Sequence, residues 1–354
     1  MQPSIRPGSV RPRIASVESI RVLAVVAVIA IHTTPFEHAG SPIGRSLDLA
    51  TLLNQATRFA VPFFLVVSGF FWSRKVAETG RLRGPTAALV RRALLVWLAW
   101  SVIYLMPVNL LDALGQGPLG PLKVIWWNAA RVLERPAVAL LEGTSPHLWF
   151  LVALAFCAVT SAVFMHIGAR GALAVLAVAL YAVGLAGQAY PRAPFGFAID
   201  PSFRNGHLFA LAFFATGAWL QRRGPTAAWL PVGAALAIAG YGLHLLEVVA
   251  NHRLWGMPLE RDYVTGTYLF GVGVAMMALS GTRTFDWPAV AALGKWVLGI
   301  YAAHMVFVGL LAPLDRRLTG APWWELGYVA AVFVLSYALT RLLARYAVTR
   351  RLVT

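Results

Sequence analysis

The stretch SVESIRVLAVVAVIAIHTTPF, residues 16–36, decides the fold class of this chain. Every residue from Val22 to Ile31 is apolar, and about 20 mostly apolar residues suffice to cross the hydrocarbon core of a bilayer as one helix. Glu18, Arg21 and His32 interrupt the apolar pattern. Ionisable side chains inside a membrane are costly, so they mark functional positions. The stretch therefore predicts a membrane-spanning helix that carries functional groups.

The composition extends this prediction to the rest of the chain. Hydrophobic residues make up 59% of the 354 residues and charged residues only 12%, whereas a soluble domain averages about 25% charged residues. So few charges do not cover a globular surface of this size, and no segment alternates as a barrel strand does. We therefore predict an all-α integral membrane protein with about ten transmembrane helices. The predicted spans are 16–36, 50–72, 88–111, 147–167, 171–188, 205–221, 227–249, 264–280, 288–311 and 323–347.

The basic residues predict the orientation of these helices. They gather in short runs between apolar stretches, such as Arg74–Lys75 and Arg91–Arg92. A cytoplasmic N-terminus places more of them in the inner loops, as the positive-inside rule requires. We therefore expect both termini in the cytoplasm and a single membrane domain over 1–354. Its parts are a cytoplasmic N-terminal segment (1–15), a long extracytoplasmic loop (112–146) and a cytoplasmic tail (348–354). Within the loop we expect an amphipathic helix that lies along the interface.

Composition and motifs also exclude several classes of partner. The net charge is +16, which suggests nucleic acid in a soluble protein, but here the basic runs set topology and no nucleic-acid partner is expected. The single cysteine, Cys157, excludes an internal disulfide, and no His or Cys cluster has metal-ligand spacing. No cleavage site follows the first apolar run, so a retained helix is expected there. Abundant Ala and Arg favour a bacterial source, and thus a multi-pass protein of the inner membrane.

The ionisable residues of the first span share one face. Arg21 and His32 are 11 positions apart, which corresponds to about 16 Å along a helix and only about 20° around it. Glu18 lies three residues before Arg21 and is placed to pair with it. An extended pantetheine arm has a similar length, so this stripe suits a thioester donor that is held at the inner surface. The alternative is that Arg21 reaches the headgroups and His32 only marks the outer helix end.

Five motifs in order resemble the acyltransferase type three family of integral membrane acyltransferases, which includes O-acetylases of bacterial polysaccharides and some antibiotic acylases. The first is Arg21, ten residues, then His32; Glu18 precedes it where many relatives carry Asp. The others are VPFFLVVSGFFWSRK (61–75), RRALLVWLAWSVIY (91–104), SPHLWFLVAL (145–154) and LGKWVLGIYAAHMVF (293–307). Within the second motif, Ser68 and Gly69 are expected to serve close helix packing.

The resemblance implies transfer of an acyl group from acyl-CoA to a hydroxyl. We expect acetyl-CoA as the donor, and a sugar hydroxyl of a lipid-linked exopolysaccharide or surface-glycan unit as the acceptor. His32 would act as general base or as transient acyl carrier, and Arg21 and Glu18, on the same helix face, are the other catalytic candidates. Arg21 would also hold the donor, together with a set of basic residues whose alternative role is to set topology. That set is Arg91, Arg92, Arg74 and Lys75.

Three further residues are candidates for the acceptor site. His147 and Trp149 stand where the fourth predicted span begins, and His304 lies in the outer half of the ninth. An interfacial anchor or a structural histidine is the alternative for each. Among functions, the alternatives are acylation of a small natural product such as a macrolide, and a glycan or lipid transporter. The transporter predicts a repeat between the chain halves, but the Arg21–His32 stripe has no counterpart in the second half.

Overall fold

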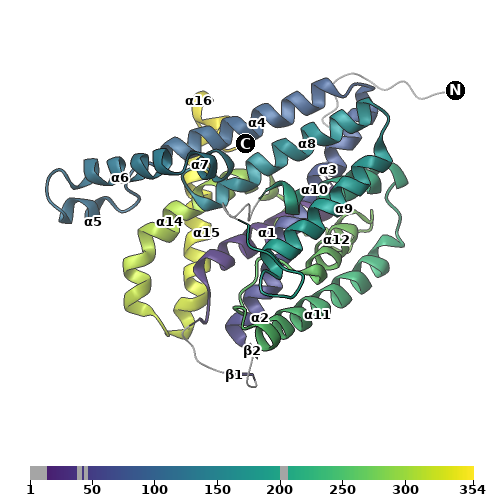
Figure 1. Cartoon of the computed structure of the whole chain (residues 1–354). Helices are drawn as coiled ribbons and strands as arrows, with labels where there is room; N and C mark the ends of the chain where they lie inside the picture. Colours follow the sequence, from purple (N-terminus) through teal and green to yellow (C-terminus); the bar gives the residue numbers. More distant parts are fainter. Residues whose placement is uncertain (1–13, 38–41, 44–46, 200–205) are drawn as a thin grey trace.

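Helices make up 78% of the computed structural model, which describes residues 14–37, 42–43, 47–199 and 206–354 (Figure 1). Within those residues the only strands are the paired β1 (Pro42–Ile43) and β2 (Leu47–Asp48), so the predicted all-α class is confirmed. The long helices are α1 (Ala15–Thr33), α3 (Ala60–Thr79), α4 (Arg83–Ile103), α6 (Gly120–Glu134), α8 (Trp149–His166), α9 (Arg170–Gly184), α10 (His207–Arg223), α11 (Trp229–Trp255), α12 (Thr265–Leu279), α14 (Val297–Leu318) and α15 (Pro322–Leu343). The short ones are α2 (Leu49–Ala56), η1 (Thr57–Phe59), α5 (Leu110–Gly115), α7 (Pro136–Glu142), η2 (Pro146–Leu148), η3 (Leu185–Ala189), α13 (Pro288–Ala291), η4 (Gly294–Trp296) and α16 (Ala347–Arg350).

Eight helical segments in the described part of the chain are long and apolar enough to cross a membrane. Two of the ten predicted spans, 205–221 and 264–280, correspond to α10 and α12, which have 17 and 15 residues and fall short of that length. The count of about ten and the orientation of the termini stay predictions. The eight segments are Ala15–Thr33, Leu49–Thr79, Arg83–Ile103, Pro146–His166, Arg170–Ala189, Trp229–Trp255, Pro288–Leu318 and Pro322–Leu343.

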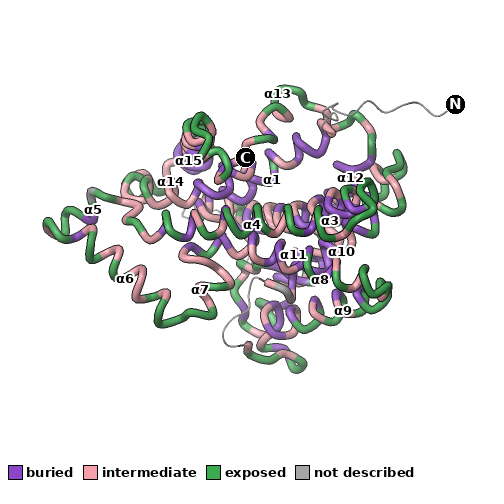
Figure 2. Tube along the Cα trace, turned by 90° about the horizontal axis from the view of Figure 1, so that it is seen from above, coloured by how far each residue is buried: buried purple, intermediate pink, exposed green. Residues whose placement is uncertain are grey.

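The first helix lies at the centre of the bundle. It packs against α3, α12, α13, α14 and α15, and much of its length is buried in Figure 2. Next to it, α3 and α10 approach each other closely at two glycines. A Cβ atom at Gly69 would stand 2.0 Å from the carbonyl oxygen of Phe214, and one at Gly217 would stand 1.9 Å from that of Val66. The packing role predicted for Gly69 is therefore confirmed.

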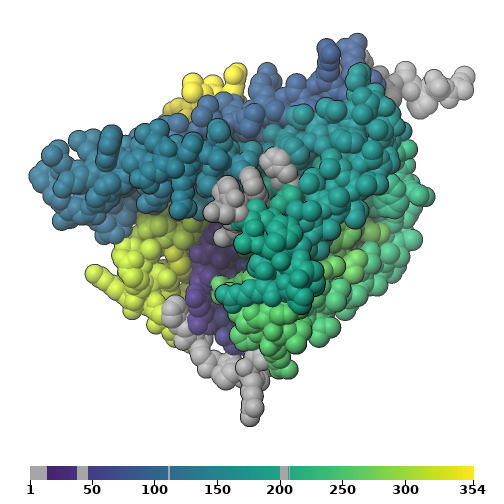
Figure 3. All heavy atoms as spheres, in the orientation of Figure 1, coloured from purple at the N-terminus to yellow at the C-terminus, as the bar shows by residue number. Residues whose placement is uncertain are grey.

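The predicted long loop, 112–146, is mostly helical and protrudes from the bundle. It forms the end of α5, then α6 and α7, and this arm extends away from the body in Figure 3. On α6 the side chains of Trp126 and Trp127 are 69% and 54% exposed. An exposed helix with such side chains is typical of a segment that lies along a membrane interface.

The C-terminal residues pack against the bundle. Val353 is fully buried beside Gly299 near the start of α14, and the Trp100 Nε1–H of α4 donates a hydrogen bond of 3.2 Å to the carbonyl of Leu352. The segment 348–354, predicted as a tail, is thus joined to the helices. The predicted N-terminal segment 1–15 lies outside the described residues, except for its last two.

Candidate active site

His32 lies in the last turn of α1, and the backbone that follows it is held in an unusual conformation. Thr34 and Phe36 have φ angles of 40° and 69°, which L-residues rarely adopt. The Thr34 N–H caps the helix by donating to the carbonyl of Ala30 (3.0 Å). The buried carboxylate of Glu325 accepts the N–H groups of Phe36 (2.7 Å) and Gly320 (3.2 Å). Glu325 therefore clamps the turn that positions His32.

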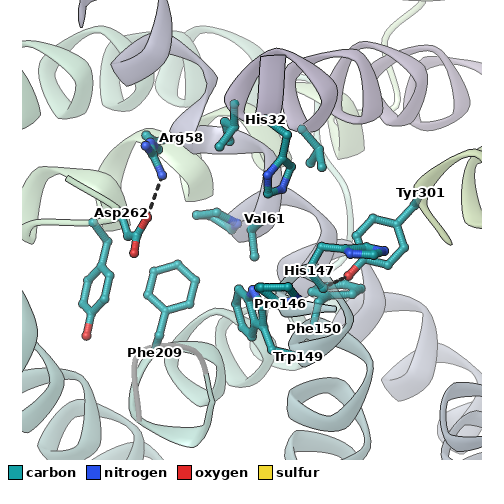
Figure 4. A pocket seen from close by; sticks show the side chains of 14 residues that line it. His32, Arg58, Val61, Pro146, His147, Trp149, Phe150, Phe209, Asp262 and Tyr301 are labelled. Atoms are coloured by element: carbon teal, nitrogen blue, oxygen red, sulfur yellow. Dashed lines mark hydrogen bonds and ion pairs between the residues drawn. The ribbon is translucent and has the colours of Figure 1, made fainter. Parts of the chain in front are cut away.

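A pocket opens next to His32. It encloses about 770 Å³ of empty space, part of which is open to the outside, and its wall is mostly apolar and aromatic. Figure 4 shows the side chains that surround it. They come from α1, η1, α3, η2, α8, α10, α14 and the α11–α12 loop: Val28, Ile31, His32, Arg58, Val61, Pro62, Pro146, His147, Trp149, Phe150, Phe209, Asp262, Tyr263 and Tyr301.

Three imidazoles form a row at the pocket wall: His32 and His147 line the pocket, and His304 lies behind them. The ring centroids of His32 and His304 are 5.2 Å apart, and those of His304 and His147 are 4.8 Å apart. Ser145 Oγ is 3.0 Å from His147 Nδ1, and the Tyr301 hydroxyl donates to the carbonyl of His147. The row joins residues of α1, η2 and α14, which are far apart in the sequence.

The hydrogen bonds define the protonation of His304. Its Nδ1 faces the carbonyl oxygen of Tyr301, which only accepts, so Nδ1 carries the proton and Nε2 is the acceptor in the neutral ring. Nε2 is buried and has no hydrogen-bond partner in the part of the chain that the structure describes, and the same holds for His147 Nε2. A buried acceptor without a partner is costly. This acceptor belongs to the ring that contacts His32.

The structure brings the predicted residues His32, His147, Trp149 and His304 to one site. Trp149 and His147 line the pocket, and His304 lies behind His32 and His147. Whether they bind the acceptor remains a prediction. Among the described residues no group of three or more His, Cys, Asp or Glu is arranged to hold a metal ion.

Glu18 and Arg21 lie at the opposite end of α1. Arg21 Nη1 donates to both carboxylate oxygens of Glu18 at 3.1 Å, so the predicted pairing is confirmed. Glu18 is buried and Arg21 is 30% exposed at its side chain. The eleven-residue spacing places Arg21 about 16 Å from His32 along the helix.

The other predicted donor-binding residues lie on the surface. Arg91 and Arg92 are exposed on α4, which packs mainly against α8. At the end of α3, Arg74 Nε donates to Glu78 Oε1 (3.0 Å), and Lys75 is exposed. None of the four lines the pocket, and their role in binding the donor remains a prediction.

One charged pair in the pocket was not predicted as functional. Arg58 Nη1 donates to Asp262 Oδ1 (2.9 Å), and the arginine side chain, 10% exposed, also contacts Asn54 Oδ1 through Nε and Nη2. Beside the pair, burial raises the pKa of Tyr263, and the Asp262 charge adds to this effect. The Tyr263 hydroxyl thus stays protonated and donates to Gln188 Oε1 (3.0 Å). The sequence signal for Arg58 was an ionisable side chain within the predicted span 50–72.

Comparisons with known proteins identify a family and two distant relatives. The sequence model of one family, described as an acyltransferase domain of the acyltransferase type three family, matches residues 14–341. The chain is also similar to a serine/alanine racemase of Enterococcus gallinarum, with 26% identity over 58% of this chain and 29% of the relative. A second similar protein is an amino-acid racemase of Enterococcus faecalis, with 24% identity over 58% of this chain and 28% of the relative.

The matched segment thus spans less than a third of these racemases. No solved structure matches the chain. The family match covers nearly the whole sequence and agrees with the apolar helices of a multi-pass membrane protein. The chain therefore belongs to the acyltransferase type three family of integral membrane acyltransferases.

Proposed function

We propose that this protein is an acetyl-CoA-dependent O-acetyltransferase of the bacterial inner membrane. Its acceptor would be a sugar hydroxyl of a lipid-linked exopolysaccharide or surface-glycan unit. One observation carries the proposal: α1 presents His32 to an aromatic pocket and holds Arg21 about 16 Å away at its other end. The pantetheine arm of acetyl-CoA has a similar length and connects the nucleotide at one end with the acyl group at the other.

His32 would perform the transfer in one of two ways. As general base it takes the proton of the acceptor hydroxyl while the oxygen attacks the thioester carbonyl; the carbon–sulfur bond then breaks and the thiolate of CoA takes that proton. As nucleophile it first forms an acyl-imidazole and releases CoA, and the hydroxyl then attacks the acyl carbon. Both routes yield one ester and one thiol.

The pocket wall supports a sugar as the acceptor. Trp149, Phe150 and Phe209 provide flat apolar faces, and the Arg58–Asp262 pair provides hydrogen-bond donors and acceptors. Pockets of this kind bind small molecules through apolar contact and fix their orientation through a few polar groups. The aromatic wall also limits water near the thioester.

The test is acetyl transfer by protein purified in detergent, with radiolabelled acetyl-CoA and lipid-linked oligosaccharide extracted from bacterial membranes. Labelled product and the free thiol of released CoA are measured together. Cys157, the single cysteine of the protein, is buried and should add little to the signal of the thiol reagent. His32→Ala should lower the rate by about 10²–10⁴-fold. His166→Ala, an exposed histidine on α8, serves as the matched control.

Near-normal transfer by a folded His32→Ala protein would contradict the catalytic role. If wild-type protein in liposomes moves the oligosaccharide across the bilayer and forms no labelled ester, the transporter is the better description.

A further inference from the structure

A second group of cations lies near the Arg21 end of α1. Lys295 Nζ is 4.9 Å from the ring centroid of Trp296, and Arg341 Cζ is 5.3 Å from the same ring. Arg341 Nη1 also donates to the hydroxyl of Tyr337 at 2.8 Å. The indole is half-buried while both cations are exposed, so one aromatic ring holds two positive charges at the surface.

No carboxylate in the described part of the chain forms an ion pair with these two cations. Among the described residues neither Lys295 nor Arg341 forms an ion pair, whereas Arg74 is paired with Glu78 and Arg21 with Glu18. Two like charges on one ring repel each other, and an anion between them would remove that repulsion. Cations that are held in place and not neutralised are suited to bind phosphate.

The packing connects this group to the proposed active site. Gly294, the neighbour of Lys295, lies so close to α1 that a Cβ atom there would stand 2.0 Å from Glu18 Oε2. From this point α14 runs beside α1, and His304 on α14 contacts His32 on α1. The α1–α14 pair therefore has His32 and His304 at one end and lies beside Lys295, in η4 just before α14, at the other. Arg341 joins this second end from α15.

We propose that Lys295 and Arg341, held by Trp296, bind the phosphates of the nucleotide part of the acyl-CoA donor. This inference rests on the proposed function, since it names the site for one part of that donor. It places the nucleotide beside the Glu18–Arg21 pair. The thioester arm then extends along the two helices that meet again at His32 and His304.

The experiment measures acetyl-CoA binding by calorimetry in a neutral detergent. The double variant Lys295→Gln/Arg341→Gln should raise the Kd by about tenfold or more, because two charge-assisted contacts are lost. The adenosine bisphosphate part of CoA should lose affinity in the same way. Acetylpantetheine, which lacks the nucleotide, should be used equally well by the variant and the wild type.

Arg223→Gln is the matched control. Arg223 is also exposed and lies 5.0 Å from the ring centroid of Trp219 at the end of α10, yet α10 packs mainly against α3 and α9. Its Kd should stay within about twofold of the wild-type value.

Three outcomes would overturn the inference. Wild-type protein that does not bind acetyl-CoA refutes both this inference and the proposed function. Wild-type binding with an unchanged Kd in the double variant refutes this inference alone. If the double variant loses binding to phosphatidylglycerol vesicles but still binds acetyl-CoA as the wild type does, the two cations bind lipid phosphates instead.

Discussion

The two ends of α1 differ in the kind of residue that they bury. At the His32 end, aromatic rings and the Arg58–Asp262 ion pair surround the site, and two imidazole nitrogens are buried without partners among the described residues. At the Arg21 end, one ion pair is half-buried and the cations Lys295 and Arg341 are exposed. Because burial of an unpaired charge is very costly, the first end suits proton transfer and the second suits recognition of an anion.

The largest effect beyond His32 is expected at His304. His304→Leu removes the buried Nε2 acceptor that lies behind His32, so kcat should fall by about hundredfold while both KM values change little. His304→Gln keeps polar atoms and should restore part of the rate. The measurement is steady-state acetyl transfer with both substrates varied. A rate within twofold of wild type in His304→Leu would show that this histidine only fills space.

The pocket side of the comparison is tested at Arg58. Arg58→Leu removes the guanidinium that donates a hydrogen bond to the Asp262 carboxylate. The KM for the acceptor should therefore rise by about tenfold, while the KM for acetyl-CoA stays unchanged. Asp262→Asn is the paired variant, and its smaller effect is expected because Asp262 is 41% exposed. An equal rise in both KM values would mean that Arg58 shapes the bundle and does not contact the acceptor.

Much of this fold was predictable because membrane helices follow local rules. The apolar stretch 16–36 became α1, and the spacing within it correctly paired Glu18 with Arg21. Helix ends were harder to predict. The predicted span 227–249 stops short of the end of α11 (Trp229–Trp255), which continues through Asn251, His252 and Arg253. No local apolar pattern specifies that extension.

The site was only partly predictable, because its residues meet through tertiary packing. Arg21 and His32 share one helix, so their spacing alone relates them. His147 and His304 were found through motifs that resemble a family, and their contact with each other depends on how η2 packs beside α14. Arg58 and Asp262 are 204 positions apart, and nothing local in the sequence links them.

A smaller effect is expected where the backbone after His32 is held. Glu325→Ala leaves the N–H of Phe36 without its acceptor, which costs about 1–3 kcal/mol when water cannot replace it. The melting temperature should fall, and kcat should drop several-fold because the turn no longer fixes His32. Glu37→Ala is the control, since that carboxylate accepts only an exposed hydrogen bond from Thr34 among the described contacts. Unchanged stability and rate in Glu325→Ala would show that the turn holds without the clamp.

The smallest effect is expected at Arg91 and Arg92, the alternative to Lys295 and Arg341 as the site for the donor phosphates. Arg91→Glu/Arg92→Glu reverses two exposed charges on α4, and surface charges contribute about 0–1 kcal/mol each. The KM for acetyl-CoA should therefore rise only a few-fold, and added salt should reduce the difference because it screens exposed charges. The KM for the acceptor should stay constant. Equal changes in both KM values would show that these arginines only set topology. If the KM for acetyl-CoA rises more than it does in Lys295→Gln/Arg341→Gln, the phosphate site lies on α4 instead.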